Sequence, residues 1–237
     1  MKLNKKSIIS IILSAICAIT FIFSSFSGVE AKAATNEVSL YYMDRQGIYH
    51  ACARYNIYIK VLNKAYDKDV TVHYTLGELN GVWEDAKATY VASLDNNYDI
   101  FKVELGGFGG LEYAIKYTVN GQTYWDNNNG NNYTGSDNLG TAPMCVLRPD
   151  YNTLSVKLNN YGYSKKVTVH YTNDNWATTQ TKDLSYSSTN DNGIEYWSTD
   201  FTRTSDTQYY ITYTVNGQTY IDNNWGNNYN SSFINNY

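Results

Sequence analysis

The amino-acid sequence predicts an all-β protein built of two tandem antiparallel β-sandwiches that follow an export signal. Three observations predict this class. The same landmarks occur twice and in the same order along the 237 residues. The segments between turns alternate apolar and polar residues with the period of a half-buried strand, and no window longer than a turn carries a helical period. The start of the chain has the composition of a secretory leader.

Residues 1–34 are expected to be a signal peptide. Three lysines precede an apolar run from Ser7 to Phe23, and Ala31-Lys32-Ala33 fits a cleavage signal. The alternative is a retained membrane anchor. The run is short, contains several Ser and Thr residues, and is followed by a processing site, which together favour cleavage. We therefore expect a secreted, extracellular protein with no membrane attachment after the leader is removed.

The tandem repeat is read from three landmarks. They are "VTVHYT" at 70–75 and 167–172, a Trp at 83 and 176, and "VNGQTY" at 119–124 and 215–220. Their spacing drifts by a few residues while their order holds, as two copies of one domain with different loop lengths would show. A solenoid would have far shorter repeats.

Domain boundaries follow from these landmarks. The first domain is expected at 36–135 and the second at 142–237. The linker between them, 136–141, lies in the Gly/Ser/Asp-rich stretch "YTGSDNLGTAP".

The alternation of apolar and polar residues predicts a series of strands in each copy. In "VTVHYT", Val70 and Val72 alternate with Thr71 and His73, and "YAIKYTV" and "YYITYTV" show the same period. Both of these end at "NG", the strongest short-range hairpin signal, because both turn residues have to adopt positive φ. "QTYWD" and "QTYID" are the returning strands. Four tyrosines fall in the inward register and are assigned to the core: Tyr74, Tyr117, Tyr171 and Tyr213.

Charge and cysteine content exclude several functions. A net charge of −4 and a pI near 5.3 argue against nucleic acid or an anionic membrane as partner. Only Cys52 and Cys145 lie beyond the leader, and whether they form a disulfide is left open. The few Cys and His residues are not clustered, so no metal site and no cofactor are expected.

No catalytic residue is predicted. The sequence lacks the motifs of serine hydrolases, zinc proteases and cysteine nucleophiles. A glycosidase needs two carboxylates facing each other across a cleft, and small sandwiches leave little room for one. His73 and His170 occupy matching positions on the outward face of a strand and are interpreted as exposed histidines without a catalytic role. The protein is therefore expected not to be an enzyme.

Two Asn-rich loops follow the returning strands, "DNNNGNN" at 126–132 and "DNNWGNN" at 222–228. A calcium loop of the EF-hand type fails in register, because Gly130 falls at its fifth position and Phe233 at its twelfth. Two readings stay open. Asn and Gly tolerate the left-handed region, so the loops could be tight connections. Alternatively, a run of amides beside a Trp has the hydrogen-bonding capacity to grip pairs of hydroxyl groups.

Two stretches of the sequence resemble a known family. "VNGQTYWDNNNGNNY" at 119–133, preceded by "NKAYDKDVTVHY" at 63–74, closely resembles carbohydrate-binding module family 21, and the second copy adds "DNW" at 174–176. This family comprises the starch- and glycogen-binding domains of some fungal glucoamylases and of glycogen-targeting phosphatase subunits. The resemblance covers both copies and implies immunoglobulin-like sandwiches with two glucan sites each.

The site residues are carried over from the resemblance by matching positions. The main site would use Trp83, Trp125, Asn127 and Asn132 in the first copy, and Trp176, Tyr210, Asn223 and Asn228 in the second. The second site would use Asn63, Tyr66, Lys68 and Tyr90, and in the other copy Asn160, Tyr163, Lys165 and Tyr186.

The copies depart from the family pattern in different places. The first has Ala114 where the main site has a third aromatic ring, and the second has Ile221 where an aromatic follows "QTY". The second copy also carries Trp225, four residues beyond Ile221. We hypothesise that Trp225 restores a carbohydrate platform from the loop. The alternative is a loop Trp that packs against the edge of the domain.

Composition supports a carbohydrate ligand independently of the resemblance. The chain has 25 tyrosines and 5 tryptophans but only 17% charged residues, so its surface presents flat rings and amides. A sugar offers apolar C–H faces and an edge of hydroxyl groups, which suit such a surface. The predicted ligand is an α-1,4-glucan, either starch, glycogen or maltooligosaccharides, and two linked copies strengthen weak binding to a repetitive polymer.

Three alternative functions stay open. A phosphatase-targeting subunit would carry a [K/R]-V-x-F motif, and none of the three Lys-Val pairs has the Phe. The second rival is an accessory or catalytic glucan-degrading enzyme, and the third is a surface adhesin for another polysaccharide. A secreted amylolytic enzyme is a possible partner, and the usage of Asn, Tyr and Lys hints at a bacterial source.

Overall fold

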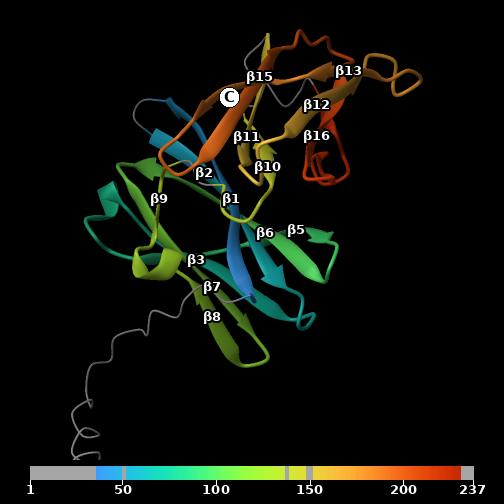
Figure 1. The fold of residues 1–237 in the computed structure, drawn as a ribbon. Coiled ribbons are helices and arrows are strands. Elements are labelled where there is room, and N and C mark those ends of the chain that lie inside the picture. Colours follow the sequence, from blue (N-terminus) through green and yellow to red (C-terminus); the bar gives the residue numbers. More distant parts are fainter. Residues whose placement is uncertain (1–35, 50–51, 137–138, 148–151, 231–237) are drawn as a thin grey trace, which may run out of the picture. The chain divides into compact units, whose positions relative to one another are not determined.

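A computed structural model describes residues 36–49, 52–136, 139–147 and 152–230 of the chain (Figure 1). These residues belong to one compact unit, Lys32–Tyr237. The expected signal peptide at 1–34 lies outside the described residues. Among the residues that are described, no helix is long and apolar enough to cross a membrane.

Strands β1 to β9 form two antiparallel sheets. The first has the order β1-β2-β6-β5, with β1 (Val38–Tyr49), β2 (Cys52–Leu62), β6 (Tyr98–Phe108) and β5 (Thr89–Leu94). The second has the order β4-β3-β7-β8, with β4 (Glu84–Lys87), β3 (Lys68–Leu76), β7 (Leu111–Val119) and β8 (Gln122–Asp126); the short β9 (Tyr133–Thr134) pairs with β7. Two 3-10 turns follow β3 and β8, namely η1 (Gly77–Leu79) and η2 (Asn128–Gly130).

Strands β10 to β18 repeat this topology. One sheet has the order β10-β11-β15-β14, with β10 (Met144–Val146), β11 (Thr153–Asn159), β15 (Ile194–Asp200) and β14 (Ser185–Thr189). The other has the order β13-β12-β16-β17, with β13 (Gln180–Asp183), β12 (Lys165–Thr172), β16 (Gln208–Val215) and β17 (Gln218–Asp222); β18 (Tyr229–Asn230) pairs with β16. Each strand of the second set therefore occupies the place of the strand nine positions earlier.

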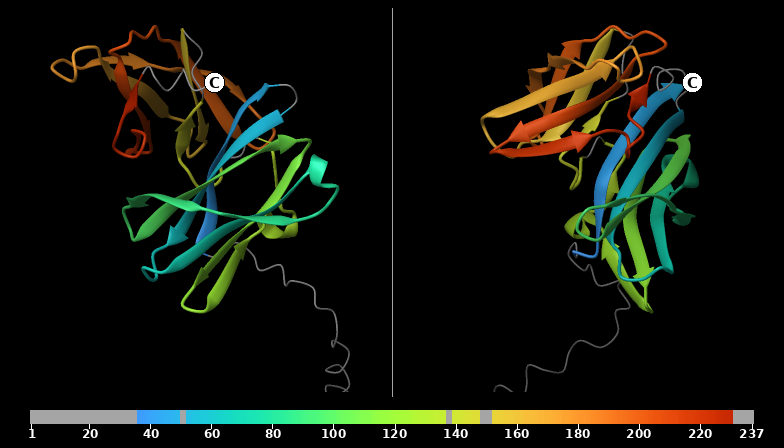
Figure 2. Two further views of the ribbon diagram at one scale, coloured as in Figure 1. Left: turned by 180° about the vertical axis from the view of Figure 1, so that it is seen from behind. Right: turned by 90° about the vertical axis from the view of Figure 1, so that its right-hand side faces the viewer.

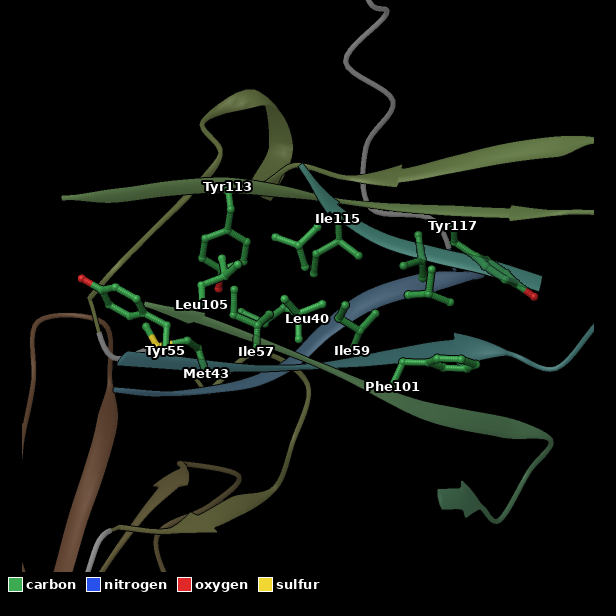
Figure 3. Packing of buried hydrophobic residues seen from close by; sticks show 14 of the residues in the cluster. Leu40, Met43, Tyr55, Ile57, Ile59, Phe101, Leu105, Tyr113, Ile115 and Tyr117 are labelled. Atoms are coloured by element: carbon green, nitrogen blue, oxygen red, sulfur yellow. The ribbon is translucent and has the colours of Figure 1, made fainter. Parts of the chain in front are cut away.

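The first pair of sheets encloses one apolar core. Figure 3 shows Tyr113, Ile115 and Tyr117 of β7 pointing toward Ile57 and Ile59 of the opposite sheet, and all five side chains are fully buried. Alternate residues of a strand face opposite sides of its sheet, so one face of β7 is buried in this core. The predicted all-β class with antiparallel sandwich packing is confirmed.

The second pair of sheets has its own core. Leu154 and Val156 of β11 are buried together with Val169 of β12 and Ile211 of β16. The inward tyrosines behave as their register predicts. Tyr117 and Tyr213 are fully buried, while Tyr74 and Tyr171 pack against the same cores from partly buried positions.

The hairpin turns are also as predicted. Asn120 and Gly121 have φ of 51° and 74°, and Asn216 and Gly217 have 51° and 77°. These left-handed conformations close a tight turn whose twist matches that of the flanking strands. The views of Figure 2 show strands joined by short connections, and the described ranges contain no α-helix.

Residues after β9 pack onto β1. Thr141 N and Ala142 N donate to the carbonyl oxygens of Leu40 and Tyr41, each at 2.9 Å, and Leu139 is fully buried. The expected linker at 136–141 is thus partly bonded to a strand in this region. Cys52 lies in β2 and Cys145 in β10, and the structure forms no disulfide between them.

Candidate functional site

An aromatic cluster lies on the outward face of the β4-β3-β7-β8 sheet. The His73 ring stacks on Trp83 with centroids 4.9 Å apart and planes at 18°, and Trp125 meets His73 edge-on at 6.0 Å. The Asp85 carboxylate lies 2.6 Å from His73 Nδ1, and Lys116 Nζ lies 5.8 Å from the Trp125 ring centre. The predicted pair, Trp83 and Trp125, is therefore brought together, with a histidine between the two rings.

Strand register explains this arrangement. His73 of β3 pairs with Ala114 of β7, and Lys116 pairs with Trp125 of β8, so all four side chains belong to one face. Ala114 stands where a third aromatic ring was expected.

A corresponding cluster forms on the β13-β12-β16-β17 sheet. His170 stacks on Tyr210 with centroids 4.7 Å apart and planes at 3°, and Trp176 lies 5.6 Å from Tyr210. Trp176 Nε1 donates to Gln208 Oε1 at 2.8 Å, and His170 Nε2 lies 3.0 Å from Thr212 Oγ1. The predicted Trp176 and Tyr210 are again brought together through a shared cluster.

Both histidines were missed as members of the candidate site. From sequence, His73 and His170 were interpreted only as exposed strand residues. The signal that could have found them is their register, because each lies directly across β3–β7 or β12–β16 from the position of the third ring. A flat imidazole adds a stacking surface of the same kind as its aromatic neighbours.

The His170 ring gives a pH prediction. Burial, aided by Lys166 and opposed by Asp183, lowers the pKa of His170 below its ordinary 6.5. The unfolded chain then binds more protons than the folded one. The free energy of unfolding should therefore fall as the pH drops below about 6.5, and this fall should end once the pH is below the pKa of His170 in the folded state. Replacing His170→Gln should remove this part of the pH dependence. Thermal unfolding of the parent and the variant from about pH 8 to about pH 4.5 measures the difference; identical slopes would contradict the prediction.

The Asn-rich loops are held by their own amides. Asn127 Oδ1 accepts from Gly130 N at 3.0 Å, and Asn223 Oδ1 accepts from Gly226 N at 2.9 Å. Asn132 Nδ2 donates to Glu112 Oε1 at 2.8 Å. Asn228 N donates to the carbonyl oxygen of Asn223 at 2.7 Å.

Backbone geometry accounts for many of these asparagines. In the first loop Asn128, Asn129 and Asn132 have φ between 52° and 57°, and in the second loop Asn224 and Asn228 have 50° and 55°. Asn enters this left-handed region at little cost. The tight-connection reading of the loops thus has a direct structural basis. The described residues include no group of three His, Cys, Asp or Glu side chains that could hold a metal ion.

An aspartate, buried in the first copy and partly buried in the second, ties each loop to the sandwich, which the sequence reasoning also missed. Asp126 Oδ2 accepts from Leu40 N at 2.7 Å and from Tyr133 Oη at 2.9 Å, and Asp126 is 1% exposed. Asp222 in turn accepts from Tyr229 Oη at 2.8 Å and from Val146 N at 3.2 Å. The recurrence of Asp at the end of both returning strands, with a Tyr seven residues later, was the available signal.

Trp225 lies in the second Asn-rich loop in a left-handed conformation. It takes φ of 58°, close to the 57° of Asn129 at the equivalent position. A left-handed Trp is strained, which calls for a compensating interaction. Its ring lies 5.8 Å from both Tyr41 and Tyr58, on β1 and β2. The ring thus contacts two strands of the first sheet pair, and a role of Trp225 in sugar binding stays a prediction.

The second predicted site of the first copy is organised around an ion pair. Lys68 Nζ donates to Asp99 in a short contact and to Asn63 Oδ1 at 2.8 Å. Ser93 Oγ donates to Asp99 at 2.7 Å and lies 3.0 Å from Tyr90 Oη. Burial opposes ionisation of Asp99, but the hydrogen bonds from Lys68 and Ser93 outweigh it and lower the pKa of this carboxyl. Hydrogen bonds thus connect three of the four predicted residues.

The second copy has a matching network. Lys165 Nζ donates to Asn160 Oδ1 at 2.8 Å and to Glu195 Oε1 at 2.7 Å, and Trp197 Nε1 donates to the other oxygen of Glu195 at 2.9 Å. Tyr186 Oη lies 2.9 Å from Thr189 Oγ1.

The predicted tyrosines of these sites are displayed to solvent. Tyr66 and Tyr163 are 102% and 103% exposed, and Tyr90 and Tyr186 are 57% and 54% exposed. They make up four of the eight large apolar side chains that are exposed in the described part of the chain. Exposed rings held beside fixed polar groups are typical of a ligand-binding surface.

Comparison with known proteins bears on these sites. Residues 55–135 match the model of the carbohydrate/starch-binding module (family 21). Glucoamylase 1 of Rhizopus oryzae is 40% identical over 91 residues, which are 36% of this chain and 14% of that enzyme. Protein phosphatase 1 regulatory subunit 3B of Bos taurus is 35% identical over 82 residues, which are 32% of this chain and 29% of that subunit.

Two solved structures are also similar. The starch-binding domain of Rhizopus oryzae glucoamylase, in complex with β-cyclodextrin and maltoheptaose, is 32% identical with a TM-score of 0.34, and the match covers 46% of this chain and 99% of that domain. The carbohydrate-binding module of the muscle glycogen-targeting subunit of Protein Phosphatase-1 is 26% identical with a TM-score of 0.30, over 40% of this chain and 75% of that one. The chain thus spans under a third of the full-length relatives but nearly all of the isolated glucoamylase domain.

Proposed function

Because the chain belongs to carbohydrate/starch-binding module family 21, represented by residues 55–135, we propose that it is a secreted, non-catalytic protein that binds α-1,4-glucans. Relatives with matching segments include a glucoamylase and a glycogen-targeting subunit of Protein Phosphatase-1. Starch, glycogen and maltooligosaccharides are the proposed ligands.

The paired exposed tyrosines carry this proposal. Tyr66 and Tyr90 recur as Tyr163 and Tyr186, with nearly equal exposures in the two copies. Leaving such rings in water has no stabilising effect on the fold, whereas covering one with a sugar face contributes about 2 kcal/mol before association costs. The neighbouring Asn and Lys groups supply hydrogen bonds for the hydroxyl edge.

We further propose that residues 142–237 are a second module of the same kind, joined to 36–135 through the linker at 136–141. The matching strand order of the two sheet pairs supports this proposal. So does the recurrence of a Trp–His aromatic cluster and of an Asn–Lys–carboxylate network at corresponding positions. Linking two weak sites makes the second contact with a polymer intramolecular and increases the overall affinity.

The same proposal implies a role outside the cell. A leader with a positive n-region, an apolar run and a cleavage signal supports export. A secreted amylolytic enzyme is the proposed partner, suggested by the glucoamylase relative. The protein would then hold glucan near that enzyme without cleaving it.

Electrophoresis in native gels that contain one polysaccharide each tests the proposal. Amylopectin and glycogen should retard the chain, while xylan and cellulose should not, because only the first two are α-1,4-glucans. Serum albumin run in the same gels controls for sieving. Equal migration in all gels would refute glucan binding, and retardation by xylan or cellulose instead would favour the adhesin alternative. Sustained release of reducing sugar from soluble starch would refute the non-catalytic role.

A further inference from the structure

We propose that the glucan surface at each histidine cluster continues into a polar groove at the adjoining end of the sandwich. Each module would then bind a longer stretch of chain than its aromatic rings cover. This inference rests on the proposed function and adds a subsite to it.

In the first module the groove follows from strand register. Thr75, Glu112 and Thr134 pair across β3, β7 and β9. Thr75 and Glu112 lie two residues from His73 and Ala114, so they share the outward face that carries the aromatic cluster. All three line a cavity of about 640 Å³. This volume falls within the range of pockets that hold small ligands.

The groove has the polar chemistry that a glucan requires. Thr75 Oγ1 is buried and has no hydrogen-bond partner in the described structure, a state that costs free energy unless a ligand or water satisfies it. Glu112 is an acceptor for hydroxyl groups and also receives the hydrogen bond from Asn132 Nδ2, a predicted site residue. A sugar hydroxyl that reaches Glu112 therefore lies next to the site already described.

Glycines keep the groove open. Gly77, Gly81, Gly109 and Gly110 form part of its lining. Gly77 and Gly109 allow their two backbones to pack closely, whereas Gly81 and Gly110 leave open space for the approach of a ligand. At Gly110 an added Cβ would meet no atom within 4 Å. The space above this residue is thus available to a ligand.

The second module has a groove at the equivalent place. Gln208 and Asn230 pair across β16 and β18 and correspond to Glu112 and Thr134. They line a cavity of about 550 Å³ together with Asp174 and Asn175. Gln208 Oε1 receives the hydrogen bond from Trp176 Nε1, which links this groove to the aromatic cluster. In both copies a polar groove therefore lies next to the aromatic cluster, although different side chains line it.

The test uses the whole chain and the indole N–H resonances of its tryptophans, because Trp83 and Trp125 report on the first module and Trp176 on the second. Titrations with maltotriose and maltoheptaose compare a short with a long ligand. The parent should bind maltoheptaose more tightly at both modules. Gly110→Gln should weaken maltoheptaose binding at the first module about fivefold, equivalent to about one hydrogen bond. Maltotriose binding and the second module should not change.

Gly106→Gln is the matched control, since an added Cβ there makes only ordinary contacts at 3.8 Å and Gly106 does not line the groove. Thr75→Val should reproduce the effect of Gly110→Gln by removing the hydroxyl group. The inference is overturned if the parent binds both sugars equally, or if Gly110→Gln leaves maltoheptaose binding unchanged. If neither sugar shifts any indole resonance, the proposed function fails instead.

Discussion

Replacing Asp126 by alanine is expected to lower the free energy of unfolding by about 3–5 kcal/mol, a large part of the 5–15 kcal/mol that holds a typical domain. The fully buried carboxylate accepts from Leu40 N, from Tyr133 Oη and from Asn128 N. Without it, a buried backbone N–H of β1 and a buried hydroxyl lose their acceptor. These groups join the loop after β8 to the opposite sheet, so the loss affects both layers.

Urea unfolding of the chain, followed by tryptophan fluorescence, measures this effect. Asp95→Ala is the matched control, because Asp95 is exposed, and its unfolding midpoint should equal that of the parent. Tyr133→Phe removes one donor and leaves the other bonds to Asp126 intact, so it should cost only about 1 kcal/mol. An Asp126→Ala variant as stable as the parent would show that the carboxylate is dispensable to the sandwich.

Removing the four exposed tyrosines, Tyr66, Tyr90, Tyr163 and Tyr186, is expected to weaken retardation by glycogen strongly, leaving only the binding that the two aromatic clusters provide. Each ring that stacks on a sugar contributes about 2 kcal/mol, so the loss of one ring should weaken its site by more than about tenfold. All four rings are at least 54% exposed, and the variant should therefore unfold at the same urea concentration as the parent. Glycogen affinity electrophoresis and urea unfolding measure the two properties separately.

Two controls sharpen this experiment. Phe108→Ala removes a 50% exposed ring that belongs to neither predicted site, and it should leave glycogen binding intact. Tyr→Phe at all four positions keeps the stacking faces and should retain most of the affinity. If the four alanine substitutions leave glycogen retardation unchanged, the binding surface lies elsewhere on the chain.

The all-β class and much of the strand pattern could be predicted from sequence. Alternation in "VTVHYT" identified the half-buried strands, and Asn120-Gly121 identified a hairpin, because local chemistry decides both features. The exposure of the predicted tyrosines also agrees with their assignment, although sugar binding by each residue stays a prediction. These features depend on residues close together in the chain.

Only the tertiary structure decided which residues that are far apart in sequence make contact. His73 joins the aromatic cluster because register sets it opposite Ala114, 41 positions away by residue number. Asp126 joins the two layers because its partner Leu40 comes from another sheet, 86 residues distant. Trp225 meets Tyr41 and Tyr58 only after the chain has folded back on itself. The sequence by itself determined the strands and their turns, which local periodicity encodes; the folded chain determined which faces, loops and rings meet, because strand pairing and core packing fix those contacts.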